Sequence, residues 1–81
     1  MSLNDQLKSA IAAALAGEWD QSHRIVQEFN DPTACWIHAV LHKIEGDDWN
    51  SCYWYARTRG ESFEVFSDPK AELESILQGL Q

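Results

Sequence analysis

Two histidines and a glutamate lie one helical turn apart in the run His38-Ala-Val-Leu-His42-Lys-Ile-Glu45. These spacings place all three side chains on one face of a helix, within about 60° of one another. Two histidines one turn apart can chelate a transition metal. A nearby glutamate can act as a further ligand or as a general base. No glutamate directly follows the first histidine, so the run does not match the His-Glu-x-x-His zinc signature.

The turn and helix after this run add four side chains to the same candidate site. A second helix after Gly46 would run antiparallel to the first and bring amide, phenol, indole and guanidinium groups near the histidines. Catalytic residues and metal ligands stay unassigned, and no cofactor is predicted. The predicted ligand-binding residues are His38, His42, Glu45, Asn50, Tyr53, Trp54 and Arg57.

An ordinary structural explanation competes with each of these assignments. Glu45 lies one turn from His42 and is its natural hydrogen-bond partner. Asp47 and Asp48 are good helix caps, and tryptophan and tyrosine rings suit the core of a small domain. A structural polar network is therefore the favoured interpretation, and a small-ligand pocket and a metal site stay open as alternatives.

Four residues near this region carry weaker signals. His23 is isolated on its predicted helix, so we expect a surface residue. Lys43 points away from the histidine face and is expected to be solvated. Cys35 and Cys52 are too few for a disulfide framework, and we expect them to be reduced, small buried hydrophobes.

Apolar residues recur at helical spacing in five segments. Gly17 and Gly46 are expected to end helices, and Asp31-Pro32 and Asp68-Pro69 to begin them. The predicted helices cover 3–16, 19–29, 32–45, 48–58 and a last segment from 69 onward, and 60–67 is predicted to be a loop held by its phenylalanines.

A weak internal repeat links the first two predicted helices to the next two. Gly17-Glu-Trp19-Asp-Gln-Ser22 is similar to Gly46-Asp-Asp-Trp49-Asn-Ser51, with the glycines 29 residues apart and one residue inserted. Each copy resembles the helix-turn-helix unit of tetratricopeptide repeats, although it differs in length and lacks the Trp-Leu-Gly run. Two such units would cover 3–58, with the last helix as a cap. Together with the helical spacing and the short connections, this predicts one all-α domain over 1–81, with two stacked antiparallel helix hairpins and a C-terminal capping helix.

The apolar stripes of these helices predict the core. In the segment 48–58, the stripe of Trp49, Cys52, Tyr53 and Ala56 is expected to face inward. Trp36 and Trp54 lie off the main stripes, so at least one should be partly exposed. The predicted core positions are Leu7, Ile11, Ile25, Val26, Val40, Leu41, Ile44, Cys52, Ala56, Leu73 and Leu77.

A second resemblance covers the middle of the chain. The run His38-Ala-Val-Leu-His42-Lys-Ile-Glu45-Gly46-Asp47, followed by Asn50-Ser-Cys-Tyr53-Trp54-Tyr55, is similar to a signature in a group of small uncharacterised helical proteins. This resemblance implies a helical fold and no particular activity.

Charge and composition narrow the function classes. The 81 residues carry a formal charge of −7, which disfavours nucleic acid and anionic membranes as partners. No signal peptide or spanning segment is evident, so a cytoplasmic protein is expected. We predict a non-enzymatic module that binds a protein, a peptide or a second copy of itself. The alternative is a small-ligand or metal-binding protein, or an enzyme, that uses the face of His38, His42 and Glu45.

Overall fold

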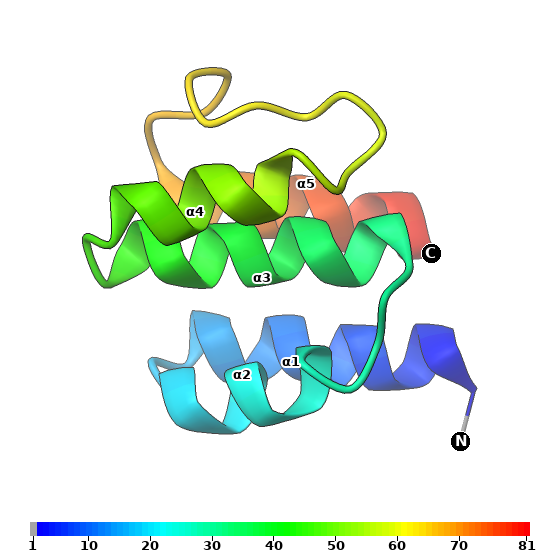
Figure 1. The fold of residues 1–81 in the computed structure, drawn as a ribbon. Coiled ribbons are helices and arrows are strands. Elements are labelled where there is room, and N and C mark those ends of the chain that lie inside the picture. Colours follow the sequence, from blue (N-terminus) through cyan, green and yellow to red (C-terminus); the bar gives the residue numbers. More distant parts are fainter. Residues whose placement is uncertain (1) are drawn as a thin grey trace.

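The protein folds into α-helices joined by short connections, except for the longer segment 56–68. The structure is a computed structural model that describes residues 2–81, and Figure 1 shows the helices in chain order. No strand occurs within this range, so the predicted all-α class is confirmed. The helices are α1 (Leu3–Leu15), α2 (Trp19–Val26), α3 (Pro32–Ile44), α4 (Asp48–Tyr55) and α5 (Pro69–Leu80).

Aspartate caps begin the later helices near the predicted positions. Asp31 precedes α3, Asp47 precedes α4 and Asp68 precedes α5, and each carboxylate accepts a backbone N–H of its own first turn. The short helices α2 and α4 end earlier than predicted, at Val26 and Tyr55. Their last carbonyls accept amides only three residues further on, so each helix closes in a tight turn.

The two hairpins repeat one another with an offset of 29 residues. The helices α1 and α3 have 13 residues each, and α2 and α4 have 8 each. In the first hairpin Ser22 Oγ donates to the carbonyl of Ala10 at 2.7 Å. In the second hairpin Ser51 Oγ donates to the carbonyl of Ala39 at the same distance. The same buried hydroxyl–carbonyl bond therefore joins both helix pairs at equivalent positions.

The predicted insertion in the second copy is wrong. Gly17 and Gly46 both have positive φ, 82° and 84°, and in each copy the bonded serine follows its glycine by five residues. Trp19 and Trp49 are therefore not equivalent. Trp19 is half-buried, whereas Trp49 is 76% exposed. The tetratricopeptide-like character of the hairpins stays a prediction.

Helices α1 and α3 lie at the centre of the fold. Helix α1 packs on α2, α3 and α5, and α3 packs on every other helix. Figure 1 shows α3 with α4 above it and α2 below it, α1 behind α2, and α5 behind α3 and α4. The side chains at the front of α3 are therefore positioned between α2 and α4.

Most predicted core positions are buried. Leu7, Ile11, Val26, Val40, Leu41 and Leu73 are fully enclosed, and Ile25 and Leu77 pack against them. Three predictions are wrong, because Ile44 is 45% exposed and Cys52 and Ala56 also face solvent. Burial of the apolar positions is the main source of stability in a domain of this size.

The errors at Cys52 and Ala56 come from one rotation of α4. Ser51 and Tyr55 are its buried residues, since Ser51 bonds the carbonyl of Ala39 and Tyr55 reaches into the interior. A step of about 100° per residue then turns the following position outward. The predicted inward stripe of α4 is in fact its exposed face.

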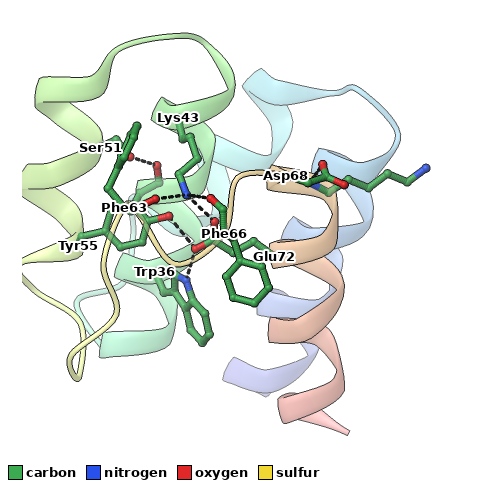
Figure 2. Close-up of polar contacts among 10 residues, drawn as sticks. Trp36, Lys43, Ser51, Tyr55, Phe63, Phe66, Asp68 and Glu72 are labelled. Atoms are coloured by element: carbon green, nitrogen blue, oxygen red, sulfur yellow. Dashed lines mark hydrogen bonds and ion pairs between the residues drawn. The ribbon is translucent and has the colours of Figure 1, made fainter.

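The carboxylate of Glu72 on α5 is buried at the back of the fold, where it bonds to α3 and α4 (Figure 2). The residue is 1% exposed. Its Oε1 accepts from Lys43 Nζ at 2.8 Å, and its Oε2 accepts from Trp36 Nε1 at 2.7 Å and from Tyr55 Oη at 2.6 Å. These bonds join α3, α4 and α5. We call these four residues the Glu72 centre.

The predicted solvation of Lys43 is wrong. Its side chain is 7% exposed, and its ammonium group also donates to the carbonyls of Phe63 and Phe66 at 3.0 and 3.1 Å. Figure 2 shows these bonds beside the pair with Glu72. The segment 60–67 is a loop, as predicted, and its anchor is the lysine as well as its phenylalanine rings.

Candidate functional site

Histidines 38 and 42 lie side by side on α3. Their spacing of four residues brings the ring centroids to 5.0 Å with an angle of 25° between the planes. Both side chains are buried, with 4% and 9% exposure. The front of α3 therefore presents two imidazoles that solvent barely reaches.

The predicted contact between His42 and Glu45 is present. His42 Nδ1 lies 2.6 Å from Glu45 Oε2. A carboxylate accepts hydrogen bonds, so His42 donates from Nδ1, and in the neutral ring Nε2 carries the lone pair. Glu45 is 39% exposed on its side chain, and it fixes the tautomer and the orientation of a ring that is otherwise buried.

A third histidine joins this pair from α2. His23 was expected to be an isolated surface residue, and that expectation is wrong. Its ring centroid lies 4.7 Å from that of His38 and 5.7 Å from that of His42, and the residue is half-buried. The packing of α2 on α3 brings them together. We call His23, His38 and His42 the histidine cluster.

Two indoles flank the cluster. Trp19 stacks on His23 with centroids 4.8 Å apart and planes 11° apart, and its Nε1 donates to the carbonyl of Leu41 at 2.6 Å. Trp54 of α4 stacks on His38 with centroids 3.9 Å apart and planes 13° apart. Each end of the cluster is therefore held by an aromatic ring from a different helix.

The surroundings of His23 and His38 favour neutral imidazoles. Burial, and after it the neighbouring His23 and His42, together lower the pKa of His38 from 6.5 to about 4. Burial also lowers the pKa of His23, with His42 as the second cause. An uncharged imidazole is the form that binds metals.

The other predicted site residues extend outward from the cluster along α4. Asn50 donates from its side chain to Asp47 at 2.6 Å, which together with the backbone hydrogen bond lowers the pKa of Asp47. Arg57 Nη2 donates to Tyr53 Oη at 2.6 Å, and the guanidinium lies over the Tyr53 and Trp54 rings at 4.7 and 5.6 Å. These side chains mostly contact one another.

The seven predicted residues thus divide into two groups. His38, His42 and Trp54 pack inside, with Glu45 at the edge. Tyr53 on the outer face of α4 and Arg57 in the turn after it form an exposed group, and Asn50 lies in the first turn of α4. Their assignment as one ligand-binding site stays a prediction.

Surface hollows occur elsewhere on the molecule. One of about 460 Å³ lies at the turn between α1 and α2 and is lined by Gly17, Glu18, Trp19, Asp20, Gln21 and Arg24. Another of about 250 Å³ lies between Leu15 and Pro69. Neither contains a residue of the histidine cluster, whose rings fill the space between α2 and α4.

Sequence reasoning missed two parts of this region. The first is His23, for which the available signal was the Trp19–His23 spacing of four residues on a helix that folds back toward His38. The second is Trp49, which stacks on Tyr53 at 6.1 Å and is largely exposed. Four aromatic residues within Trp49–Tyr55 gave no single apolar stripe that would separate inner from outer rings.

No helix within residues 2–81 combines the length and the apolar character that crossing a membrane requires. Comparisons of the chain with protein-family models, with curated proteins and with solved structures find no match.

Proposed function

We propose that this protein is a non-enzymatic interaction module that binds a basic peptide segment of a partner protein along the outer face of α4. One observation carries the proposal. Trp49 and Tyr53 of α4 and Arg57 in the turn after it follow one another at intervals of four residues, and the first two are 76% and 43% exposed. We call these three residues the α4 ridge.

The composition of the ridge supports this function. Tryptophan, tyrosine and arginine are the residue types most enriched at binding hot spots. The rings of Trp49 and Tyr53 are stacked with 16° between their planes, and Arg57 is bonded to Tyr53. The ridge is therefore partly ordered before a partner arrives, which lowers the entropic cost of binding.

Charge indicates the chemistry of the partner. The chain carries a formal charge of −7. Glu45 and Asp47 precede α4, and Asp48 is its first residue, next to Trp49 in the chain. A basic segment is attracted to this end of the ridge, and lysine or arginine can also stack on the exposed rings. Two copies of the chain repel one another, so the charge favours a different protein over self-association.

A display library of linear peptides, selected against the immobilised protein, tests the proposal. Peptides rich in lysine or arginine should be enriched and should bind the wild type in fluorescence-anisotropy titrations. Trp49→Ala should weaken binding at least about 10-fold, as expected for a hot spot, without lowering the melting temperature. Leu3→Ala is the matched control, since Leu3 is a 39% exposed apolar residue on α1.

Two results would overturn the proposal. One is that no selected peptide distinguishes the wild type from Trp49→Ala. The other is a dimer in sedimentation equilibrium that Trp49→Ala dissociates, which would assign the ridge to self-association.

The alternative function, a ligand-binding or enzymatic role of the face of His38, His42 and Glu45, remains a separate prediction. A small organic ligand would have to displace Trp54 from His38, because the two rings already stack at 3.9 Å. A ligand small enough to fit between the existing rings would avoid that cost.

A further inference from the structure

We propose that His23, His38 and His42 form a binding site for one divalent transition-metal ion of the zinc class. Each residue offers a ring nitrogen, and these atoms all lie within 4.8 Å of one another. The ligands come from two helices, α2 and α3, so the site depends on tertiary packing and not on a local motif. Imidazole is a preferred ligand of zinc, nickel, cobalt and copper ions.

The hydrogen bond of His42 suits it for this role. Metal-binding histidines usually donate their second ring N–H to a carboxylate or carbonyl, which orients the ring and raises its basicity. His42 Nδ1 makes such a bond to Glu45 Oε2 at 2.6 Å. The lone pair on Nε2 is then available to the ion, and Glu45 acts as a positioning residue.

The two indoles hold the other ligands in place. Trp54 stacks on His38, and Trp19 stacks on His23 while its own N–H is bonded to the carbonyl of Leu41 on α3. The Trp19 bond therefore fixes the helix that carries His23 against the helix that carries the other two histidines. The rings are therefore held near one another before any ion binds, although the ligand distances still have to adjust.

A small adjustment completes the coordination. Ligand nitrogens at about 2.1 Å from a tetrahedral ion lie about 3.4 Å apart. Because the present nitrogens lie within 4.8 Å of one another, the adjustment required is at most about 1.4 Å. His23 is half-buried and is the ligand with the most freedom to move. Three protein ligands leave a fourth position for water, as in open zinc sites.

A second group of donors lies next to the cluster. His42, Glu45 and Asp47 also bring their ligand atoms within 4.8 Å of one another. However, Glu45 is bonded to His42, and both Asp47 carboxylate oxygens are bonded to Asn50 at the start of α4. A metal there would have to break a helix cap, so the three-histidine set is the favoured one.

Titration of the tag-free protein with zinc tests the site. The background is Cys52→Ser, because Cys52 is an exposed thiol that could bind metal by itself. Calorimetry should give one ion per chain, with micromolar or tighter affinity. Adding cobalt instead should produce the visible absorption of a tetrahedral complex and quench tryptophan fluorescence, since two indoles contact the ligands.

Three substitutions separate the two donor sets. His23→Gln should weaken zinc binding by more than about 100-fold, which exceeds the range typical of losing an outer-shell partner. Glu45→Gln should weaken it about 10- to 100-fold. Asp47→Asn should leave the affinity unchanged, because Asp47 is outside the proposed set. Zinc should raise the melting temperature of the wild type and not that of His23→Gln.

Three outcomes would overturn the proposal. They are no zinc binding by the wild type, equal binding by His23→Gln, and loss of binding in Asp47→Asn but not in His23→Gln. Should His23→Gln fail to fold, imidazole ¹⁵N chemical shifts of the wild type decide the question. All three histidines have to shift on adding zinc, and a shift confined to His42 would contradict the proposed site.

Discussion

The molecule contains two buried polar groups that differ in how completely they are bonded. In the Glu72 centre, both carboxylate oxygens accept hydrogen bonds, and the Lys43 ammonium makes three. In the histidine cluster, the bond between His42 and Glu45 is the only hydrogen bond made by an imidazole ring to another residue within 2–81. The cluster is held instead by stacked rings.

This difference separates a structural role from a binding role. A fully bonded buried ion pair has nothing left to offer a ligand, but it fixes how α3, α4 and the loop 60–67 fit around α5. Imidazoles packed by stacking keep free lone pairs. The first group should therefore control stability, and the second should respond to protons and metals.

The largest expected effect is at Glu72. Glu72→Gln keeps the shape of the side chain but leaves the Lys43 ammonium buried without its counter-charge, which typically costs about 3–5 kcal/mol. Urea denaturation measures the loss. Combining it with Lys43→Met should cost less than the sum of the two single changes, and simple additivity would contradict a bonded centre.

Acid should act on the histidine cluster. The pKa of His38 is about 4 in the folded protein and 6.5 as its ordinary value. Between these two values the unfolded chain binds more protons, so stability is fully present above pH 6.5 and falls as the pH drops toward 4. The loss reaches roughly 3 kcal/mol from this one residue.

Urea unfolding at a series of pH values measures this slope. His38→Gln should flatten it, because the residue that titrates has been removed. A stability that stays constant between neutral pH and pH 5 in the wild type would show that His38 is more solvated than its 4% exposure indicates.

A matched pair of substitutions compares the two groups directly. Trp36→Phe removes an indole N–H that bonds the charged Glu72 at 2.7 Å, and Trp19→Phe removes one that bonds the neutral carbonyl of Leu41 at 2.6 Å. Bonds to charged groups contribute about 1.5–3 kcal/mol and neutral ones about 0.5–1.5. Thermal or urea unfolding should show a larger loss of stability in Trp36→Phe than in Trp19→Phe. Equal losses of stability would contradict the difference between the Glu72 centre and the histidine cluster.

How much of the two buried groups could be predicted from the sequence depends on how far apart the contacting residues lie along the chain. Helical spacing alone placed His38, His42 and Glu45 together, because neighbours on one helix are fixed by its pitch. His23 joins them only through the packing of α2 on α3. Lys43 finds Glu72 across 29 residues, and nothing local to the lysine indicates a buried partner.

The orientation of α4 shows a different limit of prediction from the sequence, because there the buried face of the helix was assigned wrongly. Its hydrophobic pattern is ambiguous, because Trp49, Tyr53, Trp54 and Tyr55 surround the helix on several sides. The deciding contact is the Ser51 hydroxyl bonded to the carbonyl of Ala39, which has its counterpart in the first hairpin. Aligning the two copies without an insertion would have assigned Ser51 to the interior and Trp49 to the surface.

The smallest expected effect is at Glu45, and it completes the comparison with Glu72. Glu45→Gln makes the same chemical change as Glu72→Gln, but here the carboxylate is 39% exposed. Water replaces most of what is lost, so stability should fall by roughly 0.5 kcal/mol, as for other exposed pairs. Side-by-side urea curves of the two variants measure the contrast. A loss at Glu45 as large as that at Glu72 would mean that the His42 bond supports the fold, and a small loss together with weakened zinc binding would mean that it serves the ligand.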